Sequence, residues 1–316
     1  MARKKYQQTI PSYMMTQQTA TLPSTPMERF WRKVKHIKYA KVSTILVYIL
    51  MIGLIIFEFI PVMYMLTTAF KPINELLIYP PTFYVQSPTL SNFANLTKAI
   101  STTEVPFSRY IFNSVLTTVA TVLLTVIICS MGSYALSKFK LKGANFIFGV
   151  LVAALSFGGA STAIPTYLIT NSLHMNDTYW VLIIPKIVSA YYLFLIKQFC
   201  DQIPDDFIEA AYLDGAGEWT IFWKIIMPCL RPVMASVVVF AFVGNWNDYS
   251  NALIYITDQS MKTLPLALQL ISQTGTLSRM GAMEAASLLT TLPTFVIYII
   301  MQNKVLEGVG YSGVKS

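Results

Sequence analysis

The sequence predicts an all-α polytopic membrane protein with six transmembrane helices. Of its 316 residues, 54% are hydrophobic and only 12% are charged, whereas an ordinary soluble domain has roughly 25% charged residues. A helix needs about 20 predominantly apolar residues to cross the hydrocarbon core of a bilayer. Stretches of about this length are Val42–Phe70, Ile111–Ser137, Ala144–Ile164, Tyr179–Ile196, Pro232–Ile256 and Ala285–Asn303.

The segment before the first stretch is polar and basic. Residues 1–28 are rich in Gln, Thr, Ser and Pro, a composition typical of a flexible tail. Lys and Arg before a first span favour the cytoplasmic side, so both chain ends are predicted to be cytoplasmic if the spans number six. The first apolar run is too long for the core of a signal peptide. We therefore expect a flexible basic cytoplasmic tail over residues 1–41 and a transmembrane domain over residues 42–316.

The loops agree with this orientation. Lys138, Lys140 and Lys142 follow the second stretch, on the predicted inner side, whereas residues 165–178 after the third contain no Lys or Arg. The loop after the fourth stretch is acidic, but acidic residues contribute little to the orientation rule. Residues 72–106 form a predicted outer loop that is long enough to cap a pore or to meet a soluble partner.

Several other classes of protein are disfavoured. The net charge of +8 is concentrated before the first stretch, which points away from a nucleic-acid-binding surface. The cysteines, Cys129, Cys200 and Cys229, are odd in number and have no C-x-x-C spacing, which argues against a disulfide framework or a zinc site. The chain contains no P-loop, H-E-x-x-H or G-x-S-x-G pattern, so we expect no enzymatic activity, no cofactor and no metal.

A polar segment, EAAYLDGAGEWTIFWKIIMP, separates the fourth and fifth stretches and predicts a helix-turn-helix at the membrane surface. Pro204 can open the first helix, because the N–H that it lacks has no partner there. Gly215 can adopt a positive φ and end this helix, with Asp214 suited to the turn beside it. Small side chains would let a partner approach the backbone closely; they are Ala210, Ala211, Gly215 and Ala216.

The order Glu209-Ala210-Ala211, Gly215, Ile225-x-Met227-Pro228 resembles the EAA loop of ATP-binding-cassette (ABC) importer permeases, which usually have Leu at the position of Met227. The resemblance implies a MetI-like ABC importer permease architecture with a cytoplasmic coupling helix between helices 4 and 5, within residues 204–228. It places contact with the ATPase at Glu209, Ala210, Ala211, Asp214, Gly215, Ala216 and Pro228. E-A-A triplets also occur by chance in soluble helices, and a Gly that follows a helix is commonly only a cap. The flanking apolar stretches favour coupling.

Further stretches resemble the carbohydrate branch of these permeases, which contains the maltose permease pair. They are Phe112-Asn113-Ser114, Ser133-Tyr134-Ala135-Leu136-Ser137-Lys138, Trp246-Asn247-Asp248-Tyr249 and a C-terminal segment with Gly308, Gly313, Val314 and Lys315. The resemblance covers roughly residue 40 to the end, although the last residues depart from the usual G-A-V-K-G form. It implies import of an oligosaccharide or another carbohydrate, and a permease for a non-sugar solute is the alternative.

The resemblance also implies partners and a mechanism. An extracytoplasmic solute-binding protein would deliver solute to a heterodimer of this chain and a second homologous permease subunit in the lipid bilayer of a bacterial cell membrane. Closure of cytoplasmic ABC ATPase subunits on ATP would move the coupling helices and produce alternating access. An ion-coupled secondary transporter would instead favour inverted repeats and acidic ion ligands at the midplane. No such repeat is visible in the sequence.

Charged residues within membrane spans are costly and usually face protein or water. Lys186, beside Pro185, and Asp248 are therefore candidates for the solute path, and Glu58 is a third charge within a span. Lys186 has structural ion pairing as its alternative, and Asp248 an interfacial position. The candidate path also includes Trp246, Asn247 and Tyr249. The aromatic rings of Trp246 and Tyr249 could stack on sugar faces or simply pack between helices.

Overall fold

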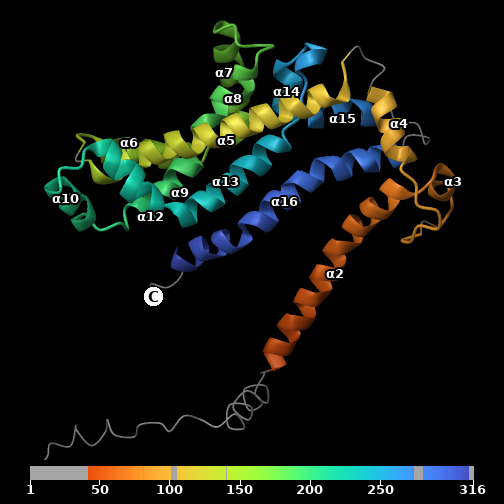
Figure 1. Cartoon of the computed structure of the whole chain (residues 1–316), viewed down its shortest axis with the longest axis horizontal. Helices are drawn as coiled ribbons and strands as arrows, with labels where there is room; N and C mark the ends of the chain where they lie inside the picture. Colours follow the sequence, from red (N-terminus) through yellow and green to blue (C-terminus); the bar gives the residue numbers. More distant parts are fainter. Residues whose placement is uncertain (1–41, 81, 101–104, 140, 274–279, 313–316) are drawn as a thin grey trace, which may run out of the picture. The chain divides into compact units, whose positions relative to one another are not determined.

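A computed structural model describes residues 42–312, apart from residues 81, 101–104, 140 and 274–279. The regular structure of these residues is entirely helical (Figure 1). The predicted flexible tail, residues 1–41, and the last residues of the C-terminal motif, from Gly313, lie outside the described residues. The chain divides into two compact units, Met1–Val62 and Met63–Ser316.

The described part of the first unit is the larger part of helix α2, Val42–Phe70. Every described side chain from Thr44 to Pro61 is exposed, including that of Glu58, although nearly all of the segment is apolar. A large exposed apolar surface marks a region that contacts lipid or protein. The range Thr44–Phe70 is long and apolar enough to cross a membrane, in agreement with the first predicted span.

Helix α5 lies at the centre of the second unit. It spans Phe107–Lys138 and packs against α8 (Tyr179–Ile187), α9 (Ala190–Cys200), α13 (Arg231–Trp246) and α15 (Leu264–Gln273). Its buried face carries small Ser and Thr side chains, which permit close helix packing in a membrane. Several of their hydroxyls bond the preceding turn of the helix; for example, Thr121 Oγ1 donates to the Thr117 carbonyl at 2.7 Å.

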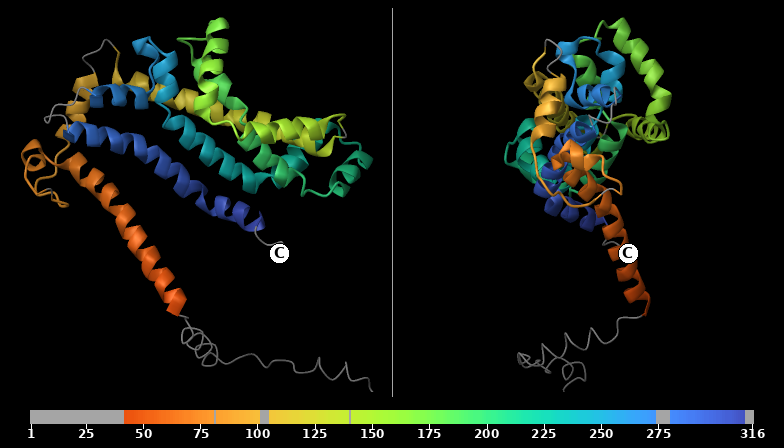
Figure 2. Two further views of the ribbon diagram at one scale, coloured as in Figure 1. Left: turned by 180° about the vertical axis from the view of Figure 1, so that it is seen from behind. Right: turned by 90° about the vertical axis from the view of Figure 1, so that its right-hand side faces the viewer.

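Helix α16, Met280–Ser312, runs beside α13 and contacts α4, Ser91–Ile100 (Figures 1 and 2). The contact with α4 is close, because a Cβ added to Gly281 would lie 2.4 Å from Asn92 Oδ1. The Asn92 side chain is buried, and its Nδ2 donates to the carbonyls of Ala69 and Lys71 at 2.9 and 2.8 Å. One amide therefore satisfies carbonyl groups at the end of α2.

The six apolar stretches do not all form single helices. Among the residues that the structure describes, three helices are long and apolar enough to cross a membrane, and three bent pairs bring the number of candidate spans to at most six. The third stretch is α6 (Ala144–Ala154) and α7 (Gly159–Ser172), which are bent by 110°. The fourth is α8 and α9, bent by 41°. Each of these two stretches can therefore be one span only as a bent pair of helices.

The break in the fourth stretch is at Val188 and Ser189, whose backbone is extended. Pro185 lies inside α8 and not at the break. A broken helix frees backbone groups that need partners. The Cys129 thiol on α5 supplies one, donating to the Ile187 carbonyl at 3.5 Å.

The third bent pair joins Glu218–Cys229 to Arg231–Trp246 at 79°, and the fifth stretch is interrupted at a later point as well. Helix α13 ends at Trp246, and a separate helix, α14, spans Ser250–Tyr255. The sequence-based prediction of one helix to Ile256 was wrong, because the chain turns at residues 247–249. The predicted outer loop contains two helices, α3 (Ile73–Leu76) and α4.

Candidate functional site

Residues 205–229 form the predicted helix-turn-helix. Its first helix, α10, spans Asp206–Leu213 and begins two residues after Pro204. Gly215 has a φ of 78°, the left-handed conformation expected for this turn. Helix α11 (Glu218–Ile221), a π-helical turn (Phe222–Ile226) and α12 (Met227–Cys229) follow without a gap. Pro228 therefore lies inside the last helical turn and not at its end.

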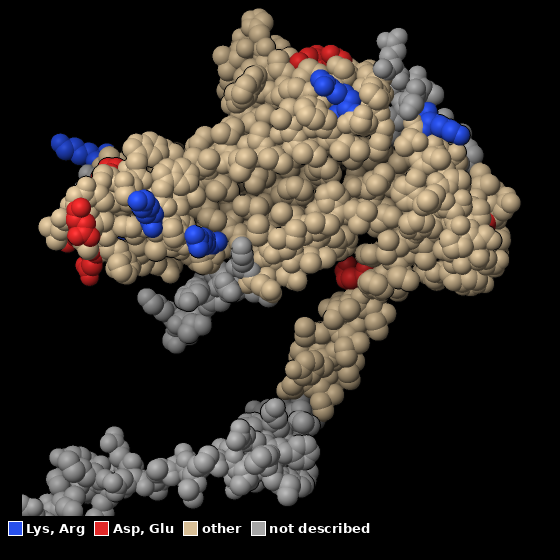
Figure 3. Space-filling view, in the orientation of Figure 1, with Lys and Arg blue, Asp and Glu red and all other residues tan. Residues whose placement is uncertain are grey.

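The two faces of α10 differ in burial. Ile208 and Ala211 are buried in the largest apolar cluster, together with residues of α5, α9 and α13. The opposite face exposes apolar side chains, including Phe207 (55% exposed), Tyr212 (46%) and Leu213 (90%). Figure 3 shows acidic side chains at the surface of the region around α10. An exposed surface that is both apolar and acidic suits contact with another protein.

The predicted contact residues divide between these two faces. Glu209, Ala210, Asp214 and Gly215 are exposed, and Ala216 is half-buried. Ala211, in contrast, is 8% exposed. Its small side chain allows α10 to pack closely on its own chain. The structure therefore exposes four of the seven predicted residues, buries Ala211, and leaves Ala216 and Pro228 half-buried, with Ala216 packed against the core cluster.

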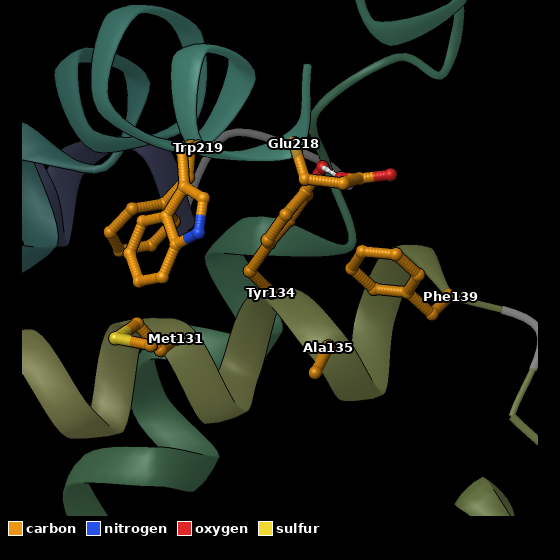
Figure 4. A pocket seen from close by; sticks show the side chains of 7 residues that line it. Met131, Tyr134, Ala135, Phe139, Glu218 and Trp219 are labelled. Carbon is orange, nitrogen blue, oxygen red and sulfur yellow. Dashed lines mark hydrogen bonds between the residues drawn. The ribbon is translucent and has the colours of Figure 1, made fainter.

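Glu218 connects the helix-turn-helix to α5. One carboxylate oxygen accepts a hydrogen bond from the Tyr134 hydroxyl at 3.0 Å (Figure 4). The other accepts one from the Tyr212 hydroxyl. The hydrogen bond to Glu218 raises the pKa of Tyr212. Beside this cluster lies an apolar pocket of about 200 Å³ lined by Met131, Tyr134, Ala135, Phe139, Glu218, Trp219 and Phe222.

The end of α5 makes further contacts with the same region. Ser137 Oγ donates to Asp201 Oδ1 at 2.6 Å, and Lys138 Nζ is 2.8 Å from Asp205 Oδ1. Ser133 Oγ donates to the Leu193 carbonyl at 3.0 Å. The motif from Ser133 to Lys138 thus attaches α5 to α9 and to the start of α10. Sequence reasoning missed this role because the partners are 60 to 84 residues away in the chain.

Among the candidate solute-path residues, Lys186 and Asp248 form an ion pair. Lys186 is in the last turn of α8, and Asp248 is in the turn between α13 and α14. Their side chains are only 23% and 12% exposed. Asp248 also accepts hydrogen bonds from Asn251, from the backbone N–H at 3.0 Å and from Nδ2 at 2.7 Å. The structure thus shows Lys186 in an ion pair, which was the alternative to a place on the solute path.

The other three candidates occupy different environments. Trp246 is 5% exposed, donates its Nε1–H to the Thr290 carbonyl at 2.8 Å, and stacks on Phe242. It is a packing residue. Asn247 and Tyr249 are exposed and line a groove of about 250 Å³. The remaining lining residues come from α4, α15 and α16: Leu96, Pro265, Leu268, Gln269, Ile271, Met283, Glu284, Ala286, Ser287 and Thr290.

The polar residues of this groove were missed by sequence reasoning. Gln269, Glu284, Ser287 and Thr290 are scattered polar residues on apolar helices, and no motif connects them. They meet because α15 and α16 pack together. Among them only Glu284 could have been noticed in the sequence, because it is a charged residue directly before the last predicted span.

The chain is similar to known membrane transport proteins. Residues 30–304 match the family model "Binding-protein-dependent transport system inner membrane component". The inner membrane ABC transporter permease protein YcjP of Escherichia coli is 31% identical over 263 residues, which cover 83% of this chain and 92% of YcjP. The arabinooligosaccharides transport system permease protein AraQ of Bacillus subtilis is 28% identical over 256 residues, which cover 81% and 90% of the two chains.

A solved structure shares the fold. It is a bacterial ABC transporter involved in the import of the acidic polysaccharide alginate, with a TM-score of 0.70 and 19% identity, and the match covers 90% of this chain and 99% of that one. The family model covers well over half of the sequence. The chain therefore belongs to the family of inner membrane components of binding-protein-dependent transport systems, the ABC transporter permeases.

Proposed function

We propose that this permease imports an oligosaccharide, with ATP hydrolysed by separate cytoplasmic subunits. The AraQ relative is named for the transport of arabinooligosaccharides, and the structural relative is involved in the import of a polysaccharide. The exposed Asn247 and Tyr249 support this assignment, because amides and aromatic rings suit hydroxyl groups and sugar faces. An importer for a non-sugar solute is the alternative, and uptake assays distinguish the two.

The observation that carries the coupling role is the position of α10. One face of the helix is fixed on the protein core, and the other exposes Phe207, Leu213 and Glu209. We infer that the ATPase holds this exposed face as a coupling helix. A displacement of α10 would be transmitted to α5 through the contacts of Tyr134, Ser137 and Lys138. Helix α5 in turn packs directly on α13.

The proposed topology has six spans and both chain ends in the cytoplasm, with residues 42–316 as one permease domain behind a basic tail. Three single helices and three bent pairs are compatible with this number. The exposed apolar side chains of α2 would contact lipid or the second permease subunit of a heterodimer. A solute-binding protein would dock on the opposite side of the membrane from α10.

Two substitutions test the coupling role in the complete transporter. Gly215→Val places a β-branched residue at a φ of 78°, a strain of about 1–2 kcal/mol. Glu209→Lys reverses a charge on the exposed face of α10. We expect both variants to insert normally and to lose ATP hydrolysis stimulated by the binding protein, together with uptake. Glu209→Lys should also release the ATPase more readily at low salt, where charge repulsion is least screened.

Gly217→Val is the matched control for Gly215→Val. Gly217 has an ordinary φ of −81°, and a Cβ there would meet no atom within 4 Å. This variant should retain coupled uptake. Wild-type uptake with the ATPase bound in both Gly215→Val and Glu209→Lys would show that α10 is only a surface helix.

A further inference from the structure

The groove beside Asn247 and Tyr249 has a distinctive balance of hydrogen-bonding groups. Ser287 Oγ donates to the Met283 carbonyl at 3.0 Å, and Thr290 Oγ1 donates to the Ser287 carbonyl at 2.9 Å. Asn247 Nδ2 donates to the Val243 carbonyl at 3.0 Å and to Thr294 Oγ1 at 3.4 Å. Each group thereby donates to other atoms of the protein, while its oxygen lone pairs remain available to the groove.

Glu284 adds a carboxylate to this surface. The side chain is half-buried at the groove wall, and no hydrogen bond or ion pair to it is present among the described residues. The described lining contains no Lys or Arg. A half-buried carboxylate strongly prefers to accept hydrogen bonds from a donor that enters the groove, since its own desolvation is otherwise uncompensated.

We propose that this groove binds an uncharged section of a saccharide and disfavours uronic acids. Neutral sugar hydroxyls can donate to Glu284, Ser287, Thr290 and Asn247, while the ring of Tyr249 offers an apolar face. A uronate carboxylate has no hydrogen to donate and would meet the negative charge of Glu284 in a partly desolvated site. This inference rests on the proposed import of oligosaccharides and adds the charge class of the solute.

The test measures direct binding to the complete transporter, purified with its partner subunits in lipid nanodiscs without the solute-binding protein. Saturation-transfer NMR detects weak ligands of such a large complex. The probes are galactotriose and trigalacturonate, which have the same length and differ in the oxidation of C6. At pH 7 we expect the wild type to bind galactotriose at least about tenfold more tightly than trigalacturonate. A single hydrogen bond to a charged group accounts for a factor of this size.

Three variants assign the preference to the groove. Glu284→Gln removes the charge at nearly constant shape and should reduce the discrimination between the probes to about twofold. Thr290→Val removes a groove hydroxyl and should weaken galactotriose binding several-fold. Thr291→Val is the matched control, because Thr291 Oγ1 also bonds its own helix, at 2.7 Å to the Ser287 carbonyl, but Thr291 does not line the groove.

Equal binding of the two probes by the wild type would overturn the proposal, as would unchanged discrimination in Glu284→Gln or failure of both probes to bind. Oligosaccharide uptake by the wild-type transporter with its binding protein is measured separately. If uptake succeeds while discrimination is absent, only the groove assignment fails. If the wild type imports no oligosaccharide at all, the proposed function fails as well.

Discussion

At the scale of single residues, the ion pair between Lys186 and Asp248 shows how the fold uses charge within a membrane protein. The pair joins the end of α8 to the turn after α13, and both side chains are largely buried. Removing one member of a buried pair leaves the other charge uncompensated, which costs more than the intact pair contributes. The pair therefore holds two helix ends together.

Lys186→Met should lower the free energy of unfolding by about 3 kcal/mol, because Asp248 would remain charged and largely buried. The second substitution, Asp248→Asn, should recover part of this loss when added to Lys186→Met. Thermal unfolding of the purified transporter in detergent measures both effects. Unchanged thermal stability of Lys186→Met combined with lost uptake would instead show that Lys186 acts on the solute.

At the scale of elements, the end of α5 is the connection between the helix-turn-helix and the rest of the second unit. Tyr134 and Tyr212 approach Glu218 from two different helices, α5 and α10. Tyr134 is 5% exposed, so its hydroxyl has little access to water as a replacement partner. Movement of α10 relative to α5 would have to stretch or break these hydrogen bonds.

The double substitution Tyr134→Phe and Tyr212→Phe should leave assembly intact and loosen coupling. Each lost hydrogen bond is worth about 1 kcal/mol, so we expect the loss of both to lower the sugar imported per ATP by up to about thirtyfold. Uptake and hydrolysis measured together in proteoliposomes report this ratio. Tyr167→Phe is a suitable control, because Tyr167 contacts Tyr255 by ring stacking far from α10 in the sequence. An unchanged ratio in the double variant would exclude Glu218 as a connection.

At the scale of the whole molecule, the prediction concerns topology. Leu213 on α10 and Tyr79 in the predicted outer loop are 90% and 91% exposed, so a Cys at either position should be accessible to a reagent. Cys129 and Cys200 are buried, and the exposed Cys229 is first replaced by Ser. An impermeant maleimide should label Tyr79→Cys in intact cells, and Leu213→Cys and Ser316→Cys only after permeabilisation. Labelling of Ser316→Cys from outside would contradict the six-span model.

The sequence by itself determined the features that depend on local chemistry. The lengths of the apolar stretches predicted where the helices lie, because the bilayer sets a minimum length for each span. Gly215 predicted the left-handed turn, because only Gly adopts a positive φ without strain. The spacing from Glu209 to Pro228 indicated the family before any contact was known.

Only the tertiary structure decided which residues face each other. It placed Ala211 and Trp246 in the core, paired Lys186 with Asp248, and gathered Gln269 and Glu284 at one groove. The breaks within the third and fourth stretches also belong to this class, since apolar composition alone does not distinguish a straight helix from a bent pair. These features depend on packing between helices that are distant in the chain, and no local pattern of residues encodes that packing.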